Sequence, residues 1–198
     1  TENAAFAEPL AAACRIVEQK LVAPGDKVAV VGDGKLGLLI IEVLARYAAE
    51  HDSPAPLLVG RHPERAALIP SAPEHVLASD TLPEMEKAFD VVVDATGSPS
   101  GLDLCTKLCR PMGTLVLKST CAAGSDFNTA PFVIDEIRGA GSRCGPSPDA
   151  LAMLAGGLDL SSLISATFPL SQAPEAVAKA GERGVVKVQI RCAFDDAS

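Results

Sequence analysis

The sequence predicts an α/β fold, a doubly wound parallel sheet with helices on both faces. Short apolar, β-branched runs alternate with amphipathic helical segments at least four times, at the spacing of βαβ units. A glycine-rich turn joins the first run to its helix. The composition, with 48% hydrophobic residues and no Trp, suits a parallel sheet covered by alanine-rich helices. Because such crossovers are right-handed, these observations predict a Rossmann-type domain.

The elements follow in order along the chain. A first helix is expected at 10–21, before the sheet begins. Strands are expected at 27–31, 57–59, 75–77, 90–94 and 114–118, alternating with helices at 35–48, 63–69, 81–88 and 99–109. A loop at 119–130 is followed by extended chain at 132–138, a second glycine-rich stretch at 139–145, helices at 147–155 and 171–181, and extended chain at 164–168 and 185–190.

Three parts of the chain follow from this pattern. Residues 1–24 form an opening segment and helix, and 25–144 form the dinucleotide-binding domain. The remaining segment, 145–198, is not another βαβ unit of the main sheet and is interpreted as the returning part of another unit.

Charge and composition exclude several classes of function. The net charge of −8 and the lack of a basic cluster argue against a nucleic-acid partner. No apolar run is long enough for a membrane span and no signal peptide opens the chain, so a cytoplasmic protein is expected. The six cysteines follow no disulfide spacing and are interpreted as reduced thiols. Cys105 and Cys109 could be half of a metal site, but core cysteines are favoured because no partner ligands lie nearby.

The turn GDGKLG at 32–37 follows an apolar strand and opens a helix, which is the context in which G-x-G-x-x-G binds a dinucleotide. Gly32 allows the tight turn, Gly34 lets a pyrophosphate approach the backbone, and Gly37 lets the helix pack closely on the sheet. The positive end of the helix dipole would face the phosphates. The alternative is a glycine-rich turn that binds nothing.

The end of the second strand decides which dinucleotide fits. An acidic residue there reads the ribose 2′-OH of NAD, but this chain has Gly60 followed by Arg61. A small residue beside guanidinium donors suits a 2′-phosphate, so NADP(H) is favoured over NAD(H). Alternatively, Arg61 is only a solvated loop residue. Thr96 and Gly97 end the fourth strand, where ligands enter such sheets, although a tight strand–helix turn would use the same residues.

Several motifs, in this order and spacing, carry a resemblance to a known family. They are FAEPLAAA at 6–13, VVGDGKLG, LLVGRHPER, DVVVDATGS, GTLVLKST, GSRCGP and GVVKVQI. The chain resembles, over almost its whole length, the cofactor-binding and C-terminal portion of the medium-chain dehydrogenase/reductase superfamily. The zinc-dependent alcohol, sorbitol and threonine dehydrogenase branches are the most similar.

The resemblance implies roles for individual residues. The pyrophosphate would be held by Gly32, Gly34, Lys35, Leu36 and Gly37, with Lys187 as a basic side chain nearby. Arg61 would meet the adenosine ribose, and the backbone at Leu117, Lys118, Ser142 and Arg143 would flank the nicotinamide. Glu8 resembles an acidic residue near the catalytic zinc, or is a carboxylate favoured at a helix start. The resemblance also implies a homodimer formed through the sheet edge near 131–143.

The chain departs from this family in one respect. The family's preceding domain supplies the zinc ligands and proton relay, and no matching segment is present, so no catalytic residue is expected here. The resemblance implies that 1–24 and 145–198 are the N- and C-terminal remnants of that catalytic domain. Zinc would be bound only if the rest of the domain were supplied, and 145–198 would pack on it or be covered by another chain. The chain is interpreted as the NADP(H)-binding portion of an oxidoreductase, or alternatively as a non-catalytic nucleotide-binding or scaffold subunit. A methyltransferase is disfavoured by the motif match.

Overall fold

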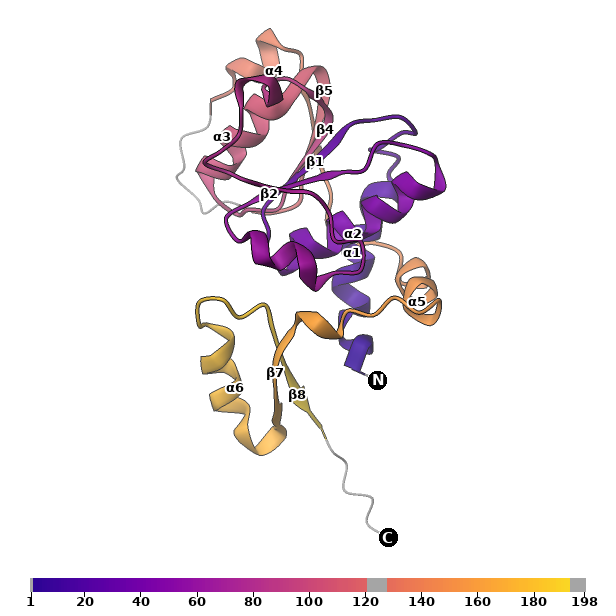
Figure 1. Cartoon of the computed structure of the whole chain (residues 1–198), viewed down its shortest axis with the longest axis vertical. Coiled ribbons are helices and arrows are strands. Elements are labelled where there is room, and N and C mark those ends of the chain that lie inside the picture. Colours follow the sequence, from indigo (N-terminus) through magenta and orange to yellow (C-terminus); the bar gives the residue numbers. More distant parts are fainter. Residues whose placement is uncertain (1, 121–127, 193–198) are drawn as a thin grey trace.

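The computed structural model describes residues 2–120 and 128–192 (Figure 1). Six parallel strands form the main sheet: β1 Val28–Val31, β2 Leu57–Gly60, β3 His75–Leu77, β4 Phe89–Asp94, β5 Cys109–Leu117 and β6 Arg138–Gly141. Their order is β3-β2-β1-β4-β5-β6, with the chain reversing direction across the sheet between β1 and β4. This is a Rossmann-type doubly wound sheet, as the sequence predicted.

Helices cover both faces of the sheet. The α-helices are α1 Ala7–Glu18, α2 Lys35–Glu50, α3 Pro99–Leu108, α4 Ala130–Ile134, α5 Ser147–Ala155 and α6 Ala173–Ala180. Short 3₁₀ helices are η1 Glu2–Phe6, η2 Pro63–Leu68, η3 Pro83–Met85, η4 Ser161–Leu163 and η5 Leu170–Gln172. The predicted helix at 63–69 is therefore a 3₁₀ helix.

The central strand β1 shows why this sequence forms a covered sheet. All four of its residues are buried, and alternate side chains point to opposite faces. Val28 and Val30 join the core cluster that contains the apolar residues of α1 and α2, whereas Ala29 and Val31 join the cluster with α3. An apolar run buried on both sides is the pattern of a parallel sheet between two helical layers.

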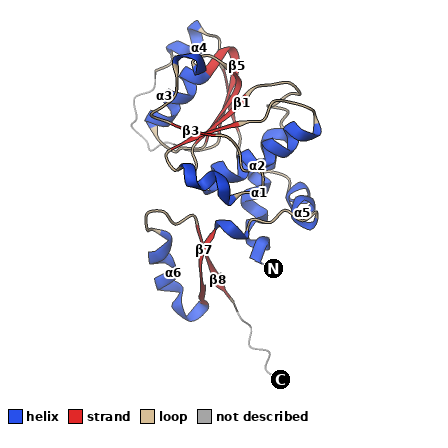
Figure 2. Ribbon diagram, viewed as in Figure 1, coloured by secondary structure: helices blue, strands red, loops and turns tan. Residues whose placement is uncertain are grey.

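A second, smaller sheet lies apart from the first (Figure 2). It pairs β7 Ile164–Pro169 with β8 Lys187–Arg191 in parallel, joined through α6. The small sheet is tied to the start of the chain. The ammonium of Lys187 lies 4.8 Å from the ring centroid of buried Phe6 and donates a hydrogen bond to the Ala5 carbonyl at 3.1 Å.

Two predicted elements are wrong. The helix expected at 81–88 is only the short η3, because the backbone N–H groups of Lys87 and Ala88 donate to carbonyls at the end of α3 instead. The extended segment expected at 132–138 begins as the last turn of α4, which has a proline in its first turn, and only Arg138 starts a strand. Of the loop expected at 119–130, residues 121–127 lie outside the described residues.

The structure also tests the expected state of the cysteines and the expected lack of a membrane-spanning helix. Cys105 and Cys109 are both fully buried, and burial raises the pKa of Cys109 to about 11, as expected for core thiols. In residues 2–120 and 128–192 all cysteines are free. Across the same residues, every helix is too short or too polar to cross a membrane.

Candidate functional site

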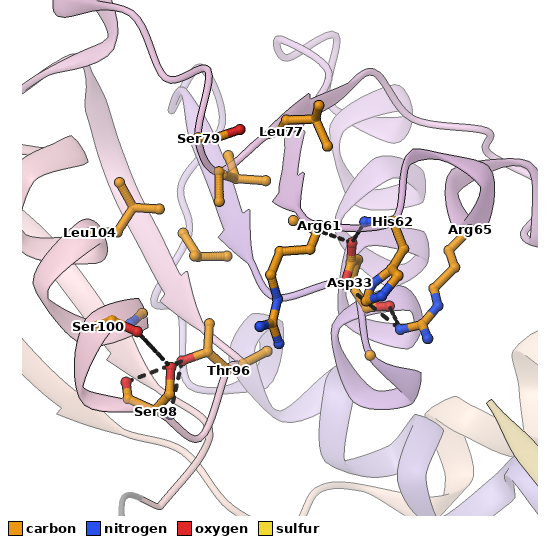
Figure 3. Close-up of a pocket in the computed structure, with 18 residues that line it drawn as sticks. Asp33, Arg61, His62, Arg65, Leu77, Ser79, Thr96, Ser98, Ser100 and Leu104 are labelled. Atoms are coloured by element: carbon orange, nitrogen blue, oxygen red, sulfur yellow. Dashed lines mark hydrogen bonds and ion pairs between the residues drawn. The ribbon is translucent and has the colours of Figure 1, made fainter. Parts of the chain in front are cut away.

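A cavity of about 770 Å³ opens at the carboxyl edge of the main sheet (Figure 3). It lies where the chain reverses direction across the sheet, the place where doubly wound sheets bind ligands. Its lining comes from the ends of β1, β2, β3 and β4 and from the start of α3: Val31, Gly32, Asp33, Gly34, Val59, Gly60, Arg61, His62, Arg65, Leu77, Ala78, Ser79, Ala95, Thr96, Ser98, Ser100, Gly101 and Leu104. The volume is within the range of small-molecule and cofactor sites.

The three glycines of the turn have different neighbours. Gly32 has a φ of +113°, and a Cβ there would lie 2.7 Å from the Ala95 carbonyl oxygen. A Cβ on Gly37 would overlap the carbonyl oxygen of Gly32. Neither position therefore has room for a side chain, because another backbone segment lies too close. A Cβ on Gly34 would have no atom within 4 Å, because this glycine faces open space beside the cavity. Gly34 therefore leaves room for a ligand rather than for protein.

The turn places the N-terminus of α2 beside the open space at Gly34. Gly34 precedes the helix in extended conformation, and no described side chain caps its first turn. Lys35 is the first helical residue, and Leu36 is partly buried against the core. The first N–H groups of this 16-residue helix have no partner within the helix, a geometry that favours an anion.

Asp33, the second residue of the turn, is buried beside the end of β2 and organises the chain that follows β2. Its Oδ2 accepts hydrogen bonds from the backbone N–H groups of Arg61 at 2.6 Å and His62 at 2.5 Å. The ring nitrogens His62 Nδ1 and His75 Nε2 lie 3.2 Å from Oδ1 and 3.3 Å from Oδ2. A Cβ on Gly60 would overlap this carboxylate.

These hydrogen bonds also fix the charge of Asp33. Burial alone raises the pKa of Asp33, but the backbone and ring hydrogen bonds from His62, with those from Arg61 and His75, hold the pKa below its usual value. The carboxylate is therefore ionised at neutral pH.

Three basic side chains surround the end of β2. The exposed Arg61 reaches into the cavity toward Thr96, while His62 and Arg65 lie on the Asp33 side (Figure 3). Arg65 donates to the Asp33 backbone carbonyl at 3.1 Å. Within the described part of the chain, the guanidinium of Arg61 has no hydrogen bond or ion pair. Of these three side chains, Arg61 is therefore the one that no described residue pairs with.

Thr96 lines the cavity from the opposite side. Its hydroxyl donates to Asp94 Oδ1 at 2.7 Å, and Asp94 Oδ2 accepts from Ser119 Oγ at 2.8 Å. Gly97 has a φ of +66° and donates its N–H to the same Ser119 hydroxyl at 2.8 Å, but it does not line the cavity. These bonds join the end of β4 to the segment after β5.

The ends of β5 and β6 meet at the same edge of the sheet, outside the cavity lining. Lys118 follows Leu117, the last residue of β5, and its ammonium donates to Ser142 Oγ at 3.0 Å and to the Arg143 carbonyl at 2.7 Å. Burial lowers the pKa of Lys118 to about 8. The structure thus brings together the two predicted backbone segments, through a side chain whose role was not foreseen.

Lys187 and Glu8 lie outside the cavity lining, and the charges of Lys35 and Glu8 both act on Lys187. Burial lowers the pKa of Lys187, the charge of Lys35 acts in the same direction, and the Glu8 carboxylate opposes it. Within residues 2–120 and 128–192, no group of three His, Cys, Asp or Glu side chains could hold a metal ion. Glu8 therefore lacks the other ligands of a zinc site, and the described residues do not fit that metal.

Several cavity-lining residues were not predicted from the sequence, among them Asp33 and Arg65. Asp33 stands inside the glycine turn and Arg65 lies four residues after Arg61, but their contacts are made with residues far along the chain. His75 and Ser79 belong to β3 and the chain after it, and only the strand order places them here.

Comparison with known proteins adds an independent observation. No family profile matches the chain. It is 28% identical over 195 residues to L-idonate 5-dehydrogenase (NAD(P)(+)) of Escherichia coli K12, covering 94% of this chain and 56% of that protein. The crystal structure of an Escherichia coli L-idonate 5-dehydrogenase matches with a TM-score of 0.84 and 25% identity, over 96% of this chain and 57% of the other. The homologues of the present chain are medium-chain dehydrogenases.

Two further comparisons cover nearly the whole chain. Sorbitol dehydrogenase of Rattus norvegicus is 25% identical over 208 residues, covering 98% of this chain and 57% of that protein. The structure of S. aureus TarJ in complex with NADPH has a TM-score of 0.80 at 16% identity, over 94% of this chain and 63% of the other, and shows a shared fold. The chain spans only about half the length of the curated relatives it matches most fully.

Proposed function

We propose that this chain is the NADP(H)-binding portion of an alcohol dehydrogenase-like oxidoreductase that transfers hydride between an alcohol or carbonyl compound and the nicotinamide. The observation that carries the proposal is the cavity at the sheet edge, with the open Gly34 position on one side and the unpaired Arg61 guanidinium facing it. The relatives' names support the same class of reaction.

A dinucleotide would use the described residues in three groups. Its pyrophosphate would lie at the α2 N-terminus beside Gly32, Gly34 and Lys35, with Gly37 holding the helix against the turn. The adenosine end would lie at Gly60 and Arg61, where a guanidinium suits a 2′-phosphate. The nicotinamide would lie toward Thr96 and the joined ends of β5 and β6.

When bound, the cofactor supplies the hydride chemistry, and this chain supplies position and charge. Substrate activation would need groups from outside the described residues, since these contain no set of metal ligands. We therefore propose that turnover requires a further segment or chain that covers the exposed apolar side chains of the C-terminal segment, among them Leu151 and Leu170.

The test of the proposed function is a titration with NADPH and NADH on the wild type and on Arg61→Ala. NADPH is expected to bind more tightly to the wild type. Arg61→Ala should weaken NADPH about 10- to 100-fold, because a charge-assisted hydrogen bond contributes roughly 1.5–3 kcal/mol, and should change NADH about twofold or less. Arg183→Ala, which removes the same charge from an exposed position outside the cavity, is the matched control. Tighter NADH binding that Arg61→Ala leaves unchanged would refute the phosphate assignment.

We also propose that the chain forms a homodimer through the sheet edge near 131–143. Among the described strands β6 pairs with β5 alone, and Val133 and Ile134 just before it are 74% and 77% exposed. Sedimentation velocity at micromolar concentration should give a dimer, and Ile134→Glu should convert it to a monomer. Leu82→Glu, at an exposed position outside this edge, should remain dimeric. A monomeric wild type would contradict the proposal.

A further inference from the structure

We infer that Asp33 contributes to the cofactor specificity of this site. It acts as a positioning residue that holds the backbone after β2 so that Arg61 faces the 2′-phosphate. The inference rests on the proposed NADP(H)-binding function and extends it from Arg61, which would touch the ligand, to a carboxylate that would not.

The hydrogen bonds of Asp33 are directed at protein groups. An ionised carboxylate has about four lone-pair positions. Here Oδ2 accepts from the backbone N–H groups of Arg61 and His62 and from His75, while Oδ1 lies within hydrogen-bond distance of the His62 ring. Three of these four interactions are made to Oδ2, and Oδ1 lies beside the His62 ring and 3.8 Å from the Arg65 guanidinium. The carboxylate is thus directed at protein donors, unlike the acid at the end of the second strand that binds the ribose hydroxyl in NAD-binding sites.

Gly60 and Asp33 restrict each other. A Cβ on Gly60 would overlap the Asp33 carboxylate, so position 60 can carry no side chain while Asp33 is in place. The same carboxylate that excludes an acidic ribose reader from the end of β2 also binds the N–H of the next residue, Arg61. The Asp33 side chain thus prevents an acidic residue at position 60, which would favour NAD, and holds the backbone of Arg61, whose guanidinium would favour NADP.

The charges around Asp33 support this division of roles. Arg65 lies 3.8 Å from Oδ1 and donates to the Asp33 backbone, so it is occupied on the protein side of the loop. The guanidinium of Arg61 extends the other way, into the cavity (Figure 3). The buried Asp33 carboxylate offsets the charge of Arg65, whereas the charge of Arg61 faces the cavity and would attract a phosphate.

The experiment compares 2′,5′-ADP with 5′-AMP as probes, by calorimetric titration, on the wild type, Asp33→Ala, Gly60→Ala and the double variant. We expect the wild type to prefer 2′,5′-ADP. Asp33→Ala should lower the affinity for 2′,5′-ADP about tenfold and change that for 5′-AMP about twofold or less, because only the 2′-phosphate contact is displaced. Gly60→Ala should produce the same selective loss, because the added Cβ would displace the Asp33 carboxylate. The double variant should keep this loss, because the Cβ of residue 33 would still lie 2.7 Å from the Cβ added at position 60.

The direction of the change separates this inference from simpler roles. If Asp33 contributed only its negative charge, Asp33→Ala would strengthen 2′,5′-ADP binding. If it contacted the ribose hydroxyl, 5′-AMP would lose as much affinity as 2′,5′-ADP. Either result overturns the inference. A wild type that binds 5′-AMP but shows no preference for 2′,5′-ADP would overturn it while leaving dinucleotide binding in place, and a wild type that binds neither probe would overturn the proposed function as well.

A conservative variant covers the case in which Asp33→Ala does not fold. Asp33→Asn keeps one carbonyl oxygen for the backbone N–H groups of Arg61 and His62 and should retain an intermediate preference for 2′,5′-ADP. Thermal unfolding of each variant is measured alongside. A preference in Asp33→Asn equal to that of the wild type would show that the ionised carboxylate is not required.

Discussion

Gly37→Ala is expected to lower the free energy of unfolding by about 3 kcal/mol and to abolish dinucleotide binding, because a Cβ there would overlap the carbonyl oxygen of Gly32. No flexible side chain can move to relieve the overlap. Gly32 has a positive φ and is itself close to the backbone of Ala95, so the turn cannot shift away. Urea unfolding followed by circular dichroism measures the stability, and NADPH titration measures the binding.

The matched control is Gly34→Ala. A Cβ at this position meets no protein atom, so the free energy of unfolding should change by less than about 1 kcal/mol. Binding should still be lost, since the methyl group would occupy the space proposed for the pyrophosphate. Gly37→Ala would then affect both stability and binding, whereas Gly34→Ala would affect binding alone. Unchanged binding in Gly34→Ala would argue against a ligand at this turn.

Phe6→Ala is expected to destabilise the chain by about 3–5 kcal/mol, the usual cost of removing a fully buried aromatic ring. Phe6 lies in the same core cluster as α1 and α2, and the Lys187 ammonium of β8 lies over its ring. The loss should therefore appear in two places, as a lower urea midpoint for the main sheet and as faster proteolysis of the small sheet.

Lys187→Met separates these contributions. It removes the cation and its hydrogen bond to Ala5 but keeps the aliphatic stem, so it should cost about 1 kcal/mol and act mainly on the small sheet. If Phe6→Ala were no more destabilising than Lys187→Met, the ring would not be a core residue of the main sheet.

The sheet could be predicted because its strands carry their own signal. Runs such as Val91 to Val93 are apolar at every position, and burial on both faces of a parallel sheet requires that. The predictions for 81–88 and 132–138 were wrong because the structure of these segments does not follow from their local hydrophobic pattern. The first is held by carbonyls at the end of α3. In the second, Val133 and Ile134 look like strand residues but are exposed on a short helix.

The candidate site divides in the same way. The glycine turn and Gly60–Arg61 were readable because their spacing is fixed by a local strand–turn–helix unit. Asp33 was not singled out, although it stands in the same motif, because its partners lie 28, 29 and 42 residues further along. The effect of a buried carboxylate depends on which donors the strand order brings to it, and a single sequence does not contain that distance information.

The contact between positions 33 and 60 also constrains the order in which substitutions can be accepted. A side chain introduced at Gly60 would meet the Asp33 carboxylate, and loss of the carboxylate alone would still leave the Cβ of residue 33 at 2.7 Å from the new Cβ. A side chain at the end of β2 would therefore need glycine at position 33 first, and a single substitution at Gly60 would meet a steric clash.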